Sequence, residues 1–195
     1  MRTCILAALL LVSANGFSQS FVKQIASHLE FGLKAGGNYS NFYNANFSTD
    51  PIYGFHAGAT MAFKITKNFL IQEDILFSTE GAKGTSGTNG TSGNINLYYM
   101  SVPILLKVRT NTGFYIEAGA QSNYKVKEDV PGWDKSAGDY AQKLDFGAVG
   151  GIGYQSPMGL GIGVRYVYGL SNVSNNTVNG SFKNQVAQAS IFYVF

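Results

Sequence analysis

The sequence predicts an all-β protein, an eight-stranded antiparallel up-and-down transmembrane β-barrel with short periplasmic turns and long extracellular loops. Three observations predict this fold: aromatic residues recur eight positions apart, apolar and polar residues alternate between them, and the segments that connect the strands alternate in length.

Aromatic residues eight positions apart mark the two rims of the predicted membrane band. An even spacing places both members of a pair on one face of a strand. Eight residues span roughly 26 Å along a strand, or about 20 Å of height at a tilt of about 40°. That height is close to the lipid-facing band of an outer-membrane barrel, which has an aromatic girdle at each rim. The predicted girdle residues are Phe31 with Tyr39, Phe55 with Phe63, Phe69 with Phe77, and Phe146 with Tyr154.

Residues 1–18 have the pattern of a secretory signal peptide. A short positive segment with Arg2 precedes an apolar run from Cys4 to Val12 and small residues suited to cleavage, which we place after Ser18. The apolar run is too short to span a membrane as a helix. Cys4 is the only cysteine, so the expected mature barrel domain, residues 19–195, would hold no disulfide and no thiolate metal site.

Eight segments of alternating polarity are the expected strands. They cover residues 29–39, 53–65, 69–80, 95–109, 113–125, 143–155, 159–171 and 184–195. The connections at 66–68, 110–112 and 156–158 are short, and those at 40–52, 81–94, 127–142 and 172–183 are long. Short turns are periplasmic in such barrels, so both chain ends are expected on that side. The second long loop, rich in Gly, Ser and Thr, predicts a solvated spacer, with an adhesive or phage-facing tip as the alternative. Trp133 in the third is expected at the headgroup level, with contact to a partner as the alternative.

Nearly every charged residue of the expected strands lies an odd number of positions from the lipid-facing residues of its strand. Its side chain therefore points into the lumen. A Lys or Arg on the lipid face near the midplane would cost about 2 to 4 kcal/mol, which explains the bias. Side chains just fill an eight-stranded lumen, so we expect a structural ionic network rather than a water-filled pore. A proton or solute path along the same side chains is the alternative. The residues of the expected luminal network are Glu30, Lys34, His56, Asp74, Lys107, Glu117, Asp145 and Arg165.

Glu73 is the exception to this parity, because it falls on the lipid-facing side between Ile71 and Ile75. A β-bulge could shift the register at this point and turn the side chain inward. Alternatively, Glu73 contacts a partner protein. We favour the bulge.

The sequence offers little chemistry for catalysis. Some eight-stranded outer-membrane barrels modify lipid A, and such an enzyme needs a nucleophile beside a histidine and an acid near the outer rim. His56 and Asp74 with Ser78 or Thr79 could supply such a triplet, but any polar lumen offers similar ones. GxSxG, HExxH, phosphate-loop and CxxC motifs are absent from the sequence. We therefore expect no catalytic residue, no cofactor and no metal site. The formal net charge of +3 is too small to indicate nucleic-acid binding.

Five strand sequences have a recognisable order and spacing: FGLKAGGNYSNF, FLIQEDILFSTEGAKG, YYMSVPILLKV, LDFGAVGGIGY and GVRYVYGLSN. Together they resemble the PorT-like outer-membrane β-barrel family common in Bacteroidetes. The resemblance covers essentially the whole mature chain. Two departures are Glu73, where such sequences often have a proline, and Ser101, where they often have an acid. The resemblance implies an eight-stranded barrel in the outer membrane of a Bacteroidetes-like source and no catalytic residue. The founding member is linked to type IX secretion and gliding.

The last residues, SIFYVF, resemble the C-terminal signal that the barrel-assembly machinery reads, with Phe195 as the terminal aromatic and Tyr193 on the same face. The expected partners are therefore outer-membrane lipid, the barrel-assembly machinery during biogenesis, and secretion-machine or other envelope proteins. We expect a non-catalytic envelope scaffold or a binding protein that acts through its loops. A lipid A-modifying enzyme and a small-solute channel are the alternatives.

Overall fold

The computed structural model describes residues 27–45, 48–84, 93–130, 139–175 and 181–195. The predicted signal peptide at 1–18, Trp133 and the centre of the second long loop lie outside these ranges. No helix in the described ranges is long and apolar enough to cross a membrane.

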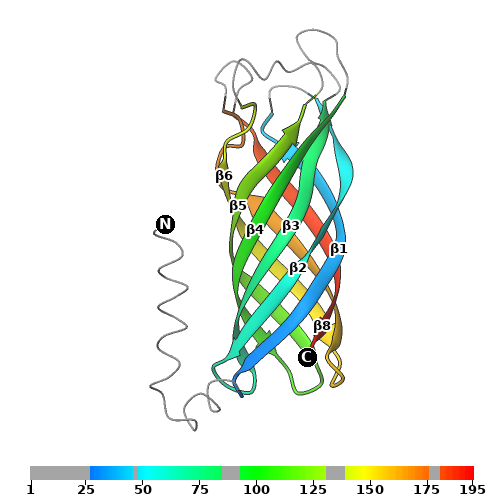
Figure 1. The fold of residues 1–195 in the computed structure, drawn as a ribbon, viewed down its shortest axis with the longest axis vertical. Coiled ribbons are helices and arrows are strands. Elements are labelled where there is room, and N and C mark those ends of the chain that lie inside the picture. The colour runs from blue at the N-terminus through cyan, green and yellow to red at the C-terminus, as the bar shows by residue number, and fades with distance from the viewer. Residues whose placement is uncertain (1–26, 46–47, 85–92, 131–138, 176–180) are drawn as a thin grey trace, which may run out of the picture.

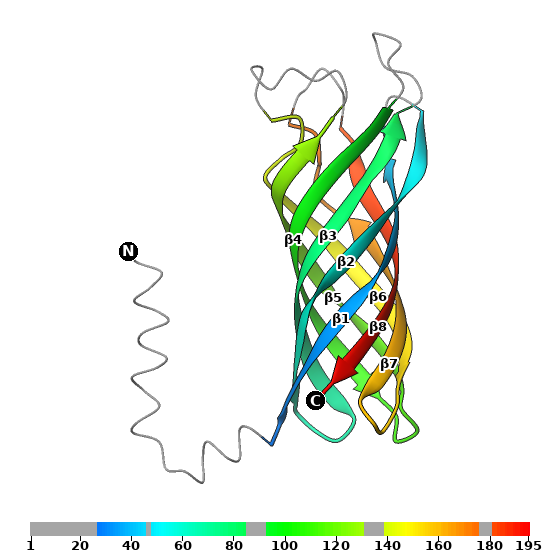
Figure 2. The same ribbon diagram turned by 45° about the vertical axis from the view of Figure 1, so that its right-hand side comes forward.

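Eight antiparallel strands close into a barrel, which β8 completes by pairing with β1 (Figure 1). Consecutive strands are neighbours throughout, and the three short turns gather at the end where the C-terminus lies (Figure 2). The predicted fold class is confirmed. The strands are β1 Leu29–Tyr43, β2 Thr49–Lys64, β3 Phe69–Gly84, β4 Gly93–Arg109, β5 Phe114–Asp129, β6 Leu144–Gln155, β7 Leu160–Gly169 and β8 Lys183–Val194.

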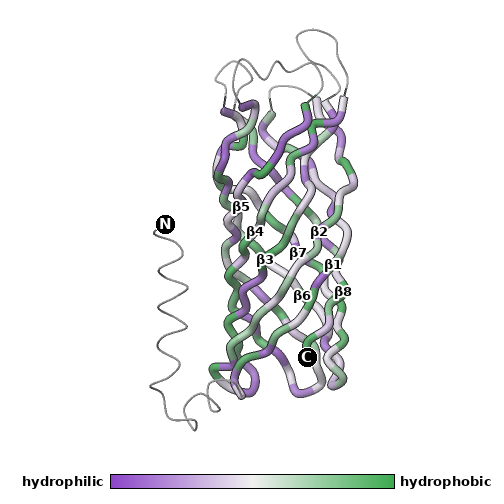
Figure 3. Tube along the Cα trace, viewed as in Figure 1, coloured by the Kyte–Doolittle hydropathy of each residue, from purple (hydrophilic) through white to green (hydrophobic). Residues whose placement is uncertain are grey.

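The strands of the first half of the barrel are longer than predicted at the loop end. β1 ends at Tyr43 and β3 at Gly84, each four residues beyond the predicted limit, and β2 begins at Thr49, four residues earlier than predicted. The predicted limits lie near the aromatic rim. That rim marks the edge of the membrane, whereas backbone pairing continues beyond it into polar sequence, as hydrophilic residues at the loop end show (Figure 3).

The outer wall presents apolar side chains to the membrane. Seven of the eight predicted girdle residues are exposed there, and Tyr154 is partly covered. Further rim aromatics were not predicted as girdle residues. Tyr53 packs beside Tyr39 with ring centroids 5.3 Å apart, and Phe114 packs beside Tyr154 at 5.1 Å.

The β-bulge predicted at Glu73 is wrong. Glu73 pairs with Met61 of β2 and with Ile104 of β4, and the register around it is continuous on both sides. The register shifts lie elsewhere, between Pro51 and His56 and between Tyr98 and Tyr99. Both shifts are toward the loop end of their strands. Glu73 therefore faces the lipid, and its parity needs another explanation.

Candidate functional site

The lumen holds the charged residues that the sequence analysis singled out, and it is packed in layers. At the periplasmic end, Glu30 of β1 accepts two hydrogen bonds from Arg109 of β4, at 3.1 and 2.9 Å, and pairs with Lys64 of β2 at 3.0 Å. Arg109 also donates to Gln155 of β6 at 2.8 Å. We call these four residues the periplasmic mouth. The ion pairs join β1 to its neighbour β2 and, across the lumen, to β4.

Four charged side chains from alternate strands meet in the middle of the lumen. Asp74 of β3 accepts from Lys34 of β1 at 2.7 Å and from Arg165 of β7 at 2.6 Å. Arg165 reaches across to Glu117 of β5 through two of its nitrogens, one of them at 3.2 Å from the carboxylate. We call Lys34, Asp74, Glu117 and Arg165 the central ionic cluster. All four are buried. Two positive and two negative charges balance, and the hydrogen bonds between them offset part of their desolvation cost.

Lys107 lies beside this cluster without an ion pair among the described residues. Its ammonium donates to Gln72 at 3.1 Å and sits 3.8 Å from the centroid of the Tyr115 ring, a cation–π distance. Gln72 in turn donates to Asp74 at 2.9 Å. The cavity bounded by Glu30, Lys34, Gln72 and Lys107, among others, has a volume of about 10 Å³. This is room for about one water molecule.

His56 lies above the cluster and bonds to neutral groups. Its Nδ1 is 2.7 Å from the Asn38 amide oxygen, and its Nε2 is 2.8 Å from the Ser190 hydroxyl. Asp74 is held instead by Lys34 and Arg165, as described above. The proposed triplet of His56, Asp74 and Ser78 is therefore not assembled by hydrogen bonds, since both imidazole nitrogens have other partners.

Two carboxylates lie toward the loop end, each held by neutral donors. Glu80 accepts from Ser78 at 2.8 Å and from Asn184 at 2.5 Å. Asp145 accepts from the Ser171 hydroxyl, and from Asn123 at 3.5 Å. We call Glu80, Asn123, Asp145 and Asn184 the extracellular polar layer. Asp145 and His56 were expected in the luminal ionic network with the other charged residues. Among the described residues neither makes an ion pair, because the strands present amides and hydroxyls to them.

An apolar cluster closes the lumen above this layer. Its members come from the strand ends and from the bases of two long loops, and we call it the apolar cap: Phe42, Ala82, Ile95, Leu97, Tyr99, Tyr140, Ala141, Val173 and Phe182. The strand pattern of the sequence did not predict the apolar cap. The signal in the sequence was the presence of apolar residues, such as Val173 and Phe182, in connections that are otherwise polar.

A buried ion pair fastens the third loop to the cap. Lys125 of β5 donates to Glu128 at 2.5 Å and to the Ala141 carbonyl oxygen at 2.5 Å. Glu128 accepts from the backbone N–H groups of Tyr140 at 2.8 Å and of Ala141 at 3.0 Å. Burial and the nearby Glu128 carboxylate raise the pKa of Tyr140 to about 12. The cap is thereby tied to β5 by charge-assisted hydrogen bonds.

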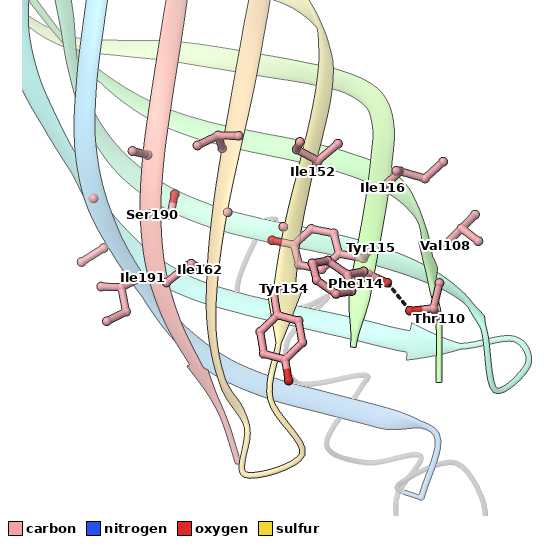
Figure 4. Close-up of a pocket in the computed structure, with 16 residues that line it drawn as sticks. Val108, Thr110, Phe114, Tyr115, Ile116, Ile152, Tyr154, Ile162, Ser190 and Ile191 are labelled. Atoms are coloured by element: carbon pink, nitrogen blue, oxygen red, sulfur yellow. Dashed lines mark hydrogen bonds between the residues drawn. The ribbon is translucent and has the colours of Figure 1, made fainter. Parts of the chain in front are cut away.

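The outer wall carries an apolar groove of about 900 Å³ in its periplasmic half (Figure 4). Side chains of neighbouring strands line it, among them Ile116 of β5, Ile152 of β6, Ile162 of β7 and Ile191 of β8. Tyr115 of the lumen closes the wall behind it, because a Cβ at Gly153 or Gly163 would lie 2.4 Å from the tyrosine hydroxyl. Glycine at these two positions leaves space for the ring. The groove faces lipid and carries no charged side chain.

A closed eight-stranded barrel with an apolar outer wall and a packed polar lumen defines the class of small outer-membrane barrels. The family model described as "Outer membrane protein beta-barrel domain" matches residues 17–175, and the chain belongs to this family. The protein is located in the bacterial outer membrane.

Solved structures of outer-membrane barrels show the same fold. Neisserial surface protein A is 16% identical, with a TM-score of 0.54, and the match covers 85% of this chain and 97% of that one. OprG from Pseudomonas aeruginosa is 14% identical, with a TM-score of 0.52, and the match covers 85% of this chain and 95% of that one. No curated protein sequence matches this chain. At these identities the likeness shows the fold alone.

Proposed function

We propose that this protein is a non-catalytic outer-membrane barrel with a side-chain-filled lumen, which acts as an envelope scaffold or as a binding partner through its extracellular loops. The observation that carries the proposal is the succession of closed layers along the lumen. The periplasmic mouth, the central ionic cluster, the extracellular polar layer and the apolar cap follow one another. Because side chains fill the lumen, the loops and the two rims of the barrel are the surfaces that remain for binding another molecule.

The environment of His56 supports a non-catalytic role. A general base takes the proton of a hydroxyl that a substrate can reach, and an acid orients its ring. The Nε2 of His56 lies 2.8 Å from the Ser190 hydroxyl, but its Nδ1 faces the neutral amide oxygen of Asn38 instead of an acid, and His56 is 1% exposed. The test is lipid A analysis by mass spectrometry in cells with the wild-type protein, the His56→Ala variant or neither. We expect identical lipid A in all three, and a modification that requires His56 would overturn the proposal.

We further propose that the chain belongs to the PorT-like group and comes from a Bacteroidetes-like source. The order and spacing of the strand motifs support this, in particular Val102-Pro103 followed by Lys107, and Arg165-Tyr166 followed by Gly169. Lys107 and Arg165 both point into the lumen, so these motif positions have a packing role in this barrel. A role in secretion does not follow from the fold.

The C-terminal residues support recognition by the barrel-assembly machinery. Phe195 is 77% exposed, its backbone N–H donates to the Phe31 carbonyl oxygen at 2.8 Å, and its ring centroid lies 5.5 Å from that of Tyr193. The aromatic side chain is therefore accessible on a fixed strand end. Phe195→Ala should reduce the amount of assembled barrel, measured as the form that migrates differently on a gel before boiling. An unchanged amount would argue against the signal.

Co-purification tests the binding role. The tagged protein would be extracted from isolated outer membranes in mild detergent, and proteins present in fixed stoichiometry would be identified. A loop variant, in which a Gly-Ser linker of equal length replaces residues 85–92, is compared with the wild-type protein and keeps the sequence of every strand. A stoichiometric partner that co-purifies with the wild type but not with the loop variant would support binding through the loops. Secretion-machine components would identify the assembly, and a lone barrel would favour the scaffold role.

A further inference from the structure

The periplasmic half of the lumen carries more positive than negative side chains. The periplasmic mouth holds two cations and one carboxylate, and the central ionic cluster holds two of each. Lys107 adds a fifth cation between them. Among the described residues, this part of the lumen therefore has an excess of two positive charges. Such an excess in a packed interior favours a bound counter-ion, because an unpaired buried charge is costly.

Lys107 is the buried cation of this excess, with 4% of its surface exposed. No carboxylate of the described residues forms an ion pair with it, since Glu117, opposite on β5, is bound by Arg165. The ammonium group has three N–H groups, and its contacts with Gln72 and with the face of the Tyr115 ring use two of them. Both of these partners are neutral. The third N–H group is left for a ligand, and that ligand has to supply the balancing charge.

The cavity of about 10 Å³ described above lies beside this ammonium group, and Lys34 and Lys107 both line it together with Gln72. The two ammonium nitrogens lie 5.7 and 5.1 Å from the centroid of the Phe192 ring, which lines the same cavity. Glu30 also lines it, but its carboxylate is held by the two cations of the periplasmic mouth. The surroundings of the cavity are therefore positive.

The cavity adjoins an approach from the periplasm. A vestibule of about 450 Å³ lies at the periplasmic end, between the short turns and the ends of β1 and β8, and Lys64 and Arg109 line it (Figure 2). It shares Glu30 and Gln155 with the small cavity, so the two spaces are neighbours. The central ionic cluster closes the far side. The approach is thus a dead end with a net positive lining, which attracts anions and needs no open pore.

The size of the cavity restricts the ligand. A volume of about 10 Å³ admits one particle of about the size of a water molecule. Water fits, but it cannot balance the charge of Lys107. A monatomic anion such as chloride is only slightly larger, and the flexible stems of the two lysines can adjust to it. Sulfate and organic anions such as gluconate are too large for this space.

We propose that the cavity between Lys34 and Lys107 binds a single chloride ion, which enters from the periplasm. The ion accepts a hydrogen bond from the third N–H group of Lys107 and balances its charge. Because the cavity exists only in the folded barrel, chloride stabilises the fold. The site is separate from the loop-mediated role proposed above and does not depend on it.

Unfolding of the wild-type barrel by urea in lipid vesicles at different chloride concentrations tests the site. Sodium gluconate replaces sodium chloride at constant ionic strength, so that the general screening of charges stays the same. A ligand of one site on the folded state lowers the ratio of unfolded to folded protein about tenfold for each tenfold increase in its concentration above the dissociation constant. We expect this dependence on chloride. An equal ratio in chloride and in gluconate would overturn the proposal.

Two variants that each remove one lysine charge locate the effect. Lys107→Met keeps an unbranched side chain without the ammonium group, and the dependence on chloride should disappear. Lys127→Met, the matched control, removes the same charge from an exposed position near the loop end of β5 and should keep the dependence. The same dependence in both variants would mean that chloride acts elsewhere, which would contradict the assigned site.

Diffraction tests the site without relying on the folding of a variant. Bromide replaces chloride at monatomic anion sites and is located by its anomalous scattering. Crystals of the wild-type barrel grown in sodium bromide should show an anomalous peak in the cavity, within hydrogen-bond distance of the Lys107 Nζ. A cavity without such a peak, whether or not bromide binds at the surface, would mean that water fills it and would overturn the proposal.

Discussion

The central ionic cluster and the extracellular polar layer are both buried in the lumen, yet they hold their carboxylates in different ways. Asp74 and Glu117 bind cationic partners that come from other strands. Glu80 and Asp145 bind only hydroxyl and amide donors among the described residues. A buried charge whose cation is removed is left uncompensated, whereas neutral donors can rotate to suit a neutral replacement. The two layers should therefore respond differently to substitution.

Removal of Arg165 should have the largest effect, because it contacts both acids of the cluster. Arg165→Met leaves Glu117 buried without its cation and is expected to lower the free energy of unfolding by about 3 to 5 kcal/mol. Urea unfolding of the barrel in lipid vesicles, followed by circular dichroism, measures the loss. The double variant Glu117→Leu with Arg165→Met should lose less than the single one, since no unpaired acid remains at 117. A free energy of unfolding of the Arg165→Met variant within about 1 kcal/mol of the wild-type value would contradict the role of Arg165 in the central ionic cluster.

Loss of a cap side chain should have the next largest effect. Phe182 is fully buried and packs on Phe42 with ring centroids 4.6 Å apart. Phe182→Ala should cost about 3 kcal/mol. Because the cap lies above the membrane band, limited proteolysis should cut the loop bases sooner while the membrane-embedded strands stay protected. Protection equal to that of wild type would mean that the cap does not depend on this ring.

A steric effect of intermediate size is expected at Gly163, where the Tyr115 side chain packs directly against the strand backbone. Gly163→Ala would place a Cβ 2.4 Å from the Tyr115 hydroxyl and should cost about 1 to 2 kcal/mol. Adding Tyr115→Phe removes that oxygen and should restore most of the stability. Gly153→Ala is the matched control. Its Cβ would also meet the Ile162 carbonyl oxygen at 2.4 Å, so Tyr115→Phe should not rescue it. Equal rescue at both positions would contradict this account.

The smallest effect is expected in the extracellular polar layer. Glu80→Gln keeps the shape of the side chain, and the Asn184 amide oxygen, which has no hydrogen-bond partner within the described residues, can accept from the new amide. The cost should stay below about 1.5 kcal/mol. Glu117→Gln makes the same chemical change in the central ionic cluster and should cost roughly 3 kcal/mol, because it leaves Arg165 with one carboxylate fewer. Equal costs would remove the distinction between the layers.

The alternation of apolar and polar residues predicted which side chains face the lumen and which face the lipid, because this alternation depends only on neighbouring residues in the chain. It placed Lys34, Asp74 and Arg165 in the lumen, where they meet. Which luminal charges pair could not be predicted, since the shear of the barrel sets their heights and brings residues from alternate strands together. Asp145 was grouped with cations that lie lower in the lumen for this reason.

The apolar cap and the position of Glu73 show two further limits. The cap is built from the bases of loops, and a strand pattern gives no register for such segments. At Glu73 the alternation of apolar and polar residues is broken, and the β-bulge expected there does not form. The continuous register means that the exception is a feature of the outer surface. Exceptions of this kind are expected at functional contacts.

The conductance of the wild-type barrel in planar lipid bilayers tests the central claim, a lumen closed by side chains, most directly. The preparation would first be shown to be folded by its gel migration before boiling, and insertion would be verified by recovery of the protein with the bilayer lipid. The account predicts no stepwise current even at high protein load. Reproducible ohmic steps of uniform size would contradict it and would favour a small-solute channel.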